Sequence, residues 1–239
     1  QGAVNDASSG DTVQVCPGTY DEQVVIASKN LTLQGAGATT IIQPSAPAIL
    51  ATLYTYPVGV LPSWVGLKLA GVILVENAGS VTVQNLKIDG ANVTSLPSGA
   101  TRLSGIVYGE SGGQISNVTL NSIKTAGYAD RTYVIDVSAG GAARSVEVDN
   151  NTINDYARTA IQLQGASLTA DVHDNDITGP GAIGPANVPN GIVFIQNAVG
   201  VASDNVVHAL HYTGSGSRSG GLMAFAATGG AGVVFSGNE

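Results

Sequence analysis

The sequence predicts an all-β fold, a single-stranded right-handed parallel β-helix (solenoid) of roughly seven coils with an N-terminal cap. Three observations predict it: a strand template that recurs along the chain, a second strand motif about ten residues before each copy, and no sustained 3.6-residue periodicity. The composition agrees, because 44% of the residues are hydrophobic, only 11% are charged, and 32 are glycines. Such a chain must bury a core between many bends.

The recurring template alternates apolar and polar residues and then places Asn or another small polar residue at a bend. It is read at 81–88, 118–125, 146–153, 172–177, 202–207 and, truncated, at 235–238. The asparagines at 151, 175, 205 and 238 follow one another by 24, 30 and 33 residues, which are coil lengths and not helix periods. Asn tolerates left-handed backbone and can hydrogen-bond its copy in the next coil, so we expect a column of asparagines at one corner. Inward residues would be Val81, Val83, Val146, Val148 and Val172, with Asn85, Asn150 and Asp174 near the shared corner.

The second motif gives each coil another strand, at 71–75, 105–108, 133–137, 160–164, 191–195 and 221–225. Alternation predicts that Val72 and Leu74 point inward in its first copy. The two outward columns would then read Ile73, Val107, Asp136, Gln162, Val193, Met223 and Val75, Gly109, Ser138, Gln164, Ile195, Phe225. Only the middle of each column is polar.

One domain accounts for all 239 residues: a cap and first coils over about 1–45, an insertion over about 46–70, and regular coils over about 71–239, the last truncated. The apolar stretch from 47 to 75 is broken by Pro57, Pro62 and Lys68, so no membrane span is predicted. Nucleic acid is not expected as a partner, because the chain has only nine basic residues and a net charge of −8. Cys16 stands alone, which excludes an internal disulfide framework.

The opening segment 10–26, followed by 31–35 and 40–42, resembles the cap and first coils of the right-handed parallel β-helix proteins of the pectate-lyase-like superfamily. With the repeats, the resemblance covers nearly the whole chain. It implies a secreted or cell-surface protein with a substrate groove on the outward face of the strands that follow the longest bends. The catalytic signatures of pectin methylesterases, polygalacturonases and pectate lyases are absent. The segment 171–174, Asp-Val-His-Asp, resembles the Asp-Pro-His-Asp of alginate epimerases, with Val in place of Pro.

A cleft is expected over the two middle coils. The bends at about 125–132 and 154–159 are short and would leave the polar outward residues open, whereas longer bends flank them on both sides. Guanidinium groups pair with carboxylates and Tyr rings stack on sugars, so this cleft suits a uronate or another acidic sugar. The predicted catalytic residues are Arg131, Asp136, Tyr156 and Arg158, and the predicted substrate-binding residues are Tyr128, Asp130, Asp155, Gln162, Gln164 and His211.

Two other groups of residues have alternative interpretations. The outward set Glu147, Asp149, Asp171 and His173 is interpreted as a solvated face, with calcium binding or a catalytic role as the alternative; calcium is the one cofactor kept open. The aromatic residues Tyr54, Tyr56 and Trp64 of the insertion could form a shelf for sugar, but packing over the N-terminal coils is favoured.

The sequence therefore predicts an extracellular or cell-surface protein that acts on or binds a polysaccharide or cell-surface glycan. Whether it is an enzyme stays open, and lyase chemistry is placed ahead of hydrolysis. In the lyase, Arg131 or Arg158 would neutralise a uronate carboxylate, and Tyr156 or the other Arg would move the proton. The alternative is a non-catalytic surface module, an adhesin or a rigid stalk. Oligomeric state stays open.

Overall fold

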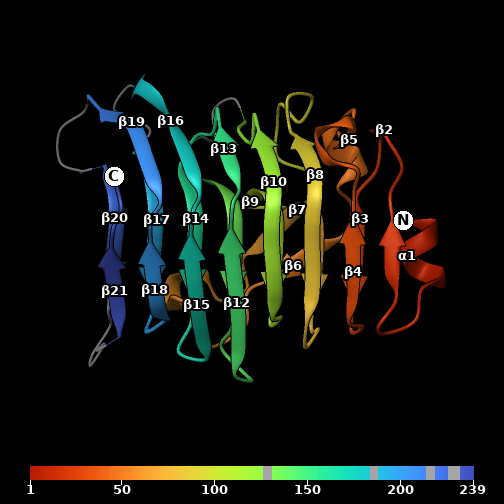
Figure 1. Ribbon diagram of the computed structural model, residues 1–239, viewed down its shortest axis with the longest axis horizontal. Helices are drawn as coiled ribbons and strands as arrows, with labels where there is room; N and C mark the ends of the chain where they lie inside the picture. The colour runs from red at the N-terminus through yellow and green to blue at the C-terminus, as the bar shows by residue number, and fades with distance from the viewer. Residues whose placement is uncertain (126–130, 184–187, 214–218, 226–231) are drawn as a thin grey trace.

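The computed structural model describes residues 1–239 apart from 126–130, 184–187, 214–218 and 226–231. Strands lie side by side along the long axis of the molecule, with the N-terminus and helix α1 at one end of the stack and the C-terminal strands at the other (Figure 1). No helix in the described part of the chain has both the length and the apolar character needed to cross a membrane.

The elements follow in this order: α1 (Gly2–Asp6), β1 (Thr12–Gln14), β2 (Gly18–Tyr20), β3 (Val24–Ala27), β4 (Leu31–Gln34), η1 (Gly37–Thr39), β5 (Thr40–Ile42), η2 (Pro47–Ile49), β6 (Leu53–Thr55), η3 (Pro62–Trp64), β7 (Lys68–Glu76), β8 (Val81–Asp89), β9 (Arg102–Gly109), β10 (Gly113–Asn121), β11 (Thr132–Ser138), β12 (Arg144–Asp149), β13 (Thr152–Asn154), β14 (Thr159–Gln164), β15 (Leu168–His173), β16 (Asp176–Ile183), β17 (Asn190–Ile195), β18 (Val199–Ser203), β19 (Val206–Tyr212), β20 (Gly220–Phe225) and β21 (Val233–Ser236).

Apart from β6, the strands pair with their copies one coil away and not with the next strand along the chain. The larger sheet runs β1-β4-β8-β10-β12-β15-β18-β21, with β2, β5, β13, β16 and β19 attached around its corner, and the second sheet runs β20-β17-β14-β11-β9-β7-β3. These pairings are parallel, whereas β6 pairs with β7 in the antiparallel direction. The chain is a parallel β-helix. The predicted parallel β-helix is confirmed.

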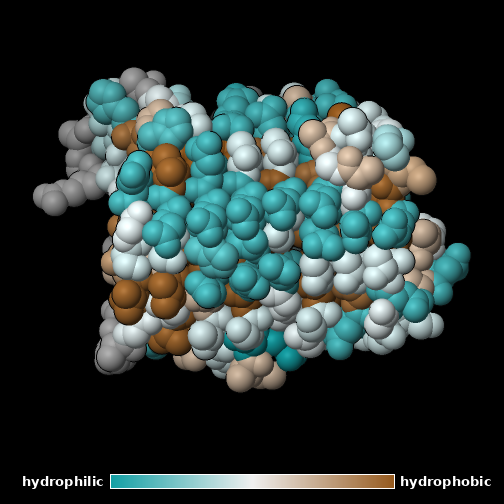
Figure 2. All heavy atoms as spheres, in the orientation of Figure 1, coloured by the Kyte–Doolittle hydropathy of each residue, from teal (hydrophilic) through white to brown (hydrophobic). Residues whose placement is uncertain are grey.

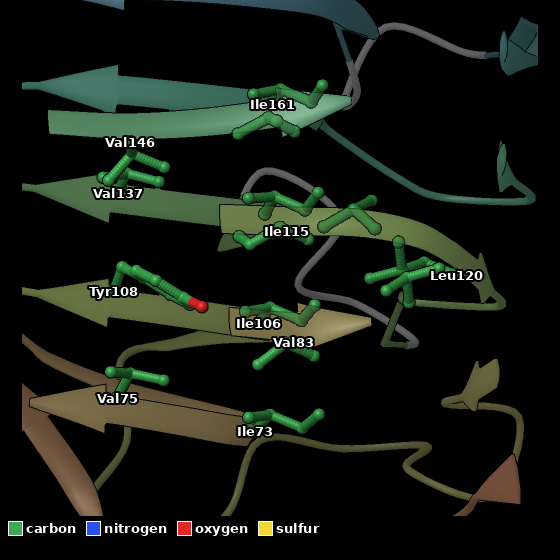
Figure 3. Close-up of a cluster of buried hydrophobic side chains, with 14 of the residues drawn as sticks. Ile73, Val75, Val83, Ile106, Tyr108, Ile115, Leu120, Val137, Val146 and Ile161 are labelled. Atoms are coloured by element: carbon green, nitrogen blue, oxygen red, sulfur yellow. The ribbon is translucent and has the colours of Figure 1, made fainter. Parts of the chain in front are cut away.

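The apolar core fills the space between the two sheets. The inward valines of the template, Val81, Val83, Val146, Val148 and Val172, are all 1% exposed or less. Ile73, Ile106 and Ile161 of the second sheet lie in the same cluster, opposite residues of the larger sheet such as Ile115 (Figure 3). Alternation of small branched side chains on both sheets is what lets successive coils stack with this register.

Two successive residues with different roles form the corner after the template. The first is left-handed: Asn85, Asn117, Asn150, Asp174 and Asp204 have φ between 53° and 55°, a conformation that Asn and Asp tolerate. The second is buried and stacked. Asn151 Nδ2 donates to Asn175 Oδ1 at 2.9 Å, Asn175 donates to Asn205 at 2.8 Å, and Asn205 donates to Asn238 at 2.9 Å. The column of asparagines thus joins four coils.

The predicted face alternation is wrong in one strand, β7. Leu74, and not Ile73, is in register with Val107, which pairs with Asp136. Ile73 and Val75 therefore point into the main core, and Leu74 belongs to a smaller cluster outside the sheet. A one-residue step exchanges the two faces of a strand. The run 72–75 is entirely apolar, so no polar residue indicates which of its side chains face the core.

Candidate functional site

The four polar residues of the predicted cleft do share one outward face of the second sheet. Asp136 pairs in register with Gln162, and Ser138 pairs with Gln164. They are not open to solvent, however, because all four are 4% exposed or less. The prediction of an open cleft is therefore wrong. We call Asp136, Ser138, Gln162 and Gln164 the covered cluster.

The insertion covers this cluster. The Tyr56 hydroxyl donates a hydrogen bond to Asp136 Oδ2 at 2.9 Å, and the Tyr54 hydroxyl lies 2.9 Å from Ser138 Oγ. Packing by the aromatic residues was the favoured expectation, but they reach the middle coils as well as the N-terminal ones. Gly109 makes this approach possible, since a Cβ there would lie 2.2 Å from a ring carbon of Tyr54. We call residues 53–67 the cover.

Burial dominates the electrostatics beneath the cover. It raises the pKa of Asp136 to about 7, although hydrogen bonds from Tyr56 and Gln162 and the charge of Arg102 oppose the rise. The Arg102 guanidinium carbon lies 4.1 Å from the Trp64 ring centroid, a cation–π contact that holds the cover to the coil below. Arg102 was not among the predicted site residues. It lies three residues before the copy of the second strand motif at 105–108, outside the alternating positions from which the site residues are predicted.

One residue of the predicted rim, Tyr156, is buried. Tyr156 is 1% exposed and packs in the main core, and its hydroxyl donates to the Asn190 carbonyl at 2.9 Å. Arg158 Nη1 donates to the Val188 carbonyl at 3.2 Å. A rim position for Tyr156 is thus wrong, because its ring is used for packing.

The remaining predicted residues come from different segments of the chain. Burial opposes ionisation of Asp155, but hydrogen bonds from Lys124 and Ser122 lower its pKa, so its partners are not arginines. His211 is exposed on β19, and Arg131 is exposed just before β11. Tyr128 and Asp130 lie outside the described residues.

The larger sheet carries a second array of outward side chains that we call the polar face. Most of its members are at least partly exposed, but Ser116 is 4% exposed and Asp149 5%, so a solvated position for Asp149 is wrong. Two outward rows run across neighbouring strands from β4 to β15 in strict register. Their members are Thr32, Thr82, Gln114, Glu147 and Asp171 in one row, and Gln34, Gln84, Ser116, Asp149 and His173 in the other. Hydrophilic residues accordingly form a continuous band across the middle of this side of the molecule (Figure 2).

Hydrogen bonds fix the orientation of the central side chains of the polar face. Asp149 accepts from Gln114 at 2.9 Å, Ser116 at 2.8 Å and Asn150 at 2.8 Å. His173 lies between two carboxylates, with Nδ1 2.8 Å from Asp174 and Nε2 3.1 Å from Glu147. The hydrogen bond with Asp174, followed by the one with Glu147, raises the pKa of His173 although partial burial opposes the rise. The two carboxylates therefore favour the protonated, charged form of this imidazole.

Metal binding was one alternative considered for this face. Within the described ranges, no three or more His, Cys, Asp or Glu side chains are placed to hold a metal ion together.

Comparisons with known proteins add the following. No family model matches the sequence, and no curated protein matches it. A solved structure with a similar fold is described as that of the PL6 family alginate lyase AlyGC. It has a TM-score of 0.45 and 12% identity, and the match covers 99% of this chain. The chain spans 37% of the length of that lyase.

Proposed function

We propose that this is a polysaccharide-binding protein of the cell exterior and that the polar face binds the polymer. The observation that carries the proposal is the in-register repetition of carboxylate, amide and hydroxyl side chains across consecutive strands. Parallel strands repeat every ~4.8 Å, so one row offers many equivalent hydrogen-bonding groups along one line. A linear glycan presents hydroxyl groups in the same repetitive way. Exposed side chains already held by a neighbour, as Glu147 is by His173, lose little entropy on binding.

The charge of the face favours a neutral glycan over a uronate polymer. Glu147, Asp149, Asp171 and Asp174 gather around the imidazole of His173, and the chain as a whole carries −8. Such a field repels an acidic polymer. The uronate-lyase mechanism through Arg131 and Arg158 stays a prediction, since both belong to bends before strands of the other sheet.

The second candidate is the non-catalytic stalk or adhesin module. The observation that favours it is that several polar-face side chains satisfy one another, as in the 3.2 Å hydrogen bond from Gln84 to Gln34. Hydrogen bonds among these side chains are sufficient for the solvated face of a rigid solenoid that binds no ligand.

One screen separates these functions. Neutral and uronate oligosaccharides are titrated calorimetrically, and each mixture is also followed for the ultraviolet absorbance of an unsaturated product. We expect a neutral glycan to bind, and we expect the double variant Glu147→Gln, Asp171→Asn to bind at least about tenfold more weakly, the loss of one or two hydrogen bonds to charged groups. Asp6→Asn, an exposed change on the cap, is the matched control. Binding of no glycan would support the stalk, and an unsaturated product would support the lyase.

A further inference from the structure

We infer that the covered cluster is a second ligand site, for one unit of a polyhydroxylated, uncharged molecule such as a sugar, and that the cover occupies it until the ligand displaces it. This inference does not depend on the polar face, which lies on the other sheet. It rests on three observations: polar groups without a normal hydrogen bond, hydroxyls supplied by the cover, and the separateness of the packing that holds the cover down.

The first observation is that the cluster has more hydrogen-bonding capacity than its surroundings use. Among the described residues, Asp136 Oδ1 and both amide atoms of Gln164 are buried without a hydrogen bond of normal length and angle, although Gln164 lies near enough to Asp136 to lower its pKa. Arg102 Nε, whose guanidinium lies over Trp64, is likewise buried without a normal hydrogen bond. Buried polar groups are nearly always paired, because an unpaired one costs free energy. In the neighbouring coils the positions in register with Asp136 and Gln162 are Val107 and Val193, so a dry cover needs no polar residue here.

The second observation is the chemistry of the cover. The cover places two hydroxyl groups on the covered cluster. The Tyr54 hydroxyl contacts Ser138, and the Tyr56 hydroxyl contacts Asp136. A carboxylate, two amides and a hydroxyl beside the rings of Trp64 and Tyr133 are the groups that recognise a sugar. The two phenols thus supply the hydroxyl groups that a sugar would supply.

The third observation concerns how the cover is attached. Its side chains Tyr54, Tyr56 and Val60 pack against the outward residues Leu69, Leu74 and Val107 of β7 and β9, in a cluster that lies outside the main core. The antiparallel β6–β7 pairing spans three residues on each strand, and beyond it Tyr56 and Gly66 bond across the loop. The cover can therefore lift without opening the solenoid core.

Trp64, the single tryptophan of the chain, lies on the cover and reports its position. The whole protein is titrated with neutral mono- and oligosaccharides while Trp64 emission and its quenching by acrylamide are measured. We expect a saturable red shift and a rise in quenching with at least one sugar. Asp136→Asn, which keeps the size of the side chain, should weaken that response at least tenfold. Glu147→Gln with Asp171→Asn should leave it unchanged, so failure at this site and failure at the polar face give different results.

Gly109→Ala tests the cover without any ligand. The added methyl group would lie 2.2 Å from the Tyr54 ring, so Trp64 should become more accessible to acrylamide while the strand content by circular dichroism is kept. Amide hydrogens of Tyr56 and Gly66 should exchange on the order of a hundredfold faster than those of β8 and β10 in the wild type. Exchange of the cover only together with the core would overturn the inference. No Trp64 response to any sugar, or a response that Asp136→Asn does not change, would also overturn it.

Discussion

The Tyr56 hydroxyl lies 2.9 Å from Asp136 Oδ2, although 80 residues separate the two in the chain. This bond joins the insertion to the middle of the second sheet. It places a carboxyl group and its hydroxyl partner where neither is exposed to water.

Asp136 should make the stability of the protein depend on pH. Its pKa is about 7 in the folded protein, against an ordinary value of 3.8, so the unfolded chain loses the proton first as the pH rises. Stability contributed by the protonated form is complete below about pH 4 and is lost as the pH rises to about 7. Thermal melts from pH 4 to 8 should show the wild type losing stability relative to Asp136→Asn across this window. Parallel curves for the two proteins would contradict the assignment.

His173 should titrate above its ordinary pKa of 6.5, because Asp174 and then Glu147 favour its charged form. Following the imidazole signals by NMR, we expect Asp174→Asn to lower the pKa of His173 more than Glu147→Gln does. Stability from this His is present at low pH and is lost as the pH rises through its folded pKa. The opposite order of the two variants would show that Glu147 is the stronger partner.

The buried corner should be sensitive at Asn175. Its side chain accepts from the Asn151 backbone N–H at 3.1 Å and donates to the Val148 carbonyl at 2.8 Å and to Asn205. Asn175→Ala leaves buried groups unpaired and should reduce the free energy of unfolding by about 2–3 kcal/mol. Asn238→Ala makes the matched change at the half-buried end of the column, where water can replace the lost bonds, and should cost less. Denaturant titrations measure both, and equal losses would argue against the column as a source of stability.

Val148→Asp should be strongly destabilising. Val148 is 0% exposed in the main core, and an unpaired carboxylate there should cost about 3–5 kcal/mol. Ser145→Asp introduces the same side chain at an exposed position of the same strand, and its effect should stay within about 0.5 kcal/mol. A melting temperature for Val148→Asp equal to that of the wild type would contradict the core as described.

The sequence by itself determined the stacked strands, the inward valines of the template and the register of the middle coils. Each copy repeats the same alternation, and parallel pairing of like with like follows from repetition. It also brought together Asn85, Asn150 and Asp174, because a small polar residue at a fixed place in each repeat marks a left-handed corner. The division of the corner between one turning residue and one stacked Asn was visible only once the coils were in place.

Only the tertiary structure decided which polar side chains are accessible. Asp136 and Gln162 face outward as the alternation predicts, yet the cover buries them, since an insertion without a repeat gives no local signal of where it will pack. Tyr156 does not reach the predicted rim, because its ring packs in the main core, and its place in a bend gives no sign of that packing. The sequence does not determine whether Leu74 faces the core or the outside, because the residues from 72 to 75 are all apolar. Repetition fixes pairing within a solenoid, but exposure depends on contacts between segments that are distant in the sequence and share no pattern.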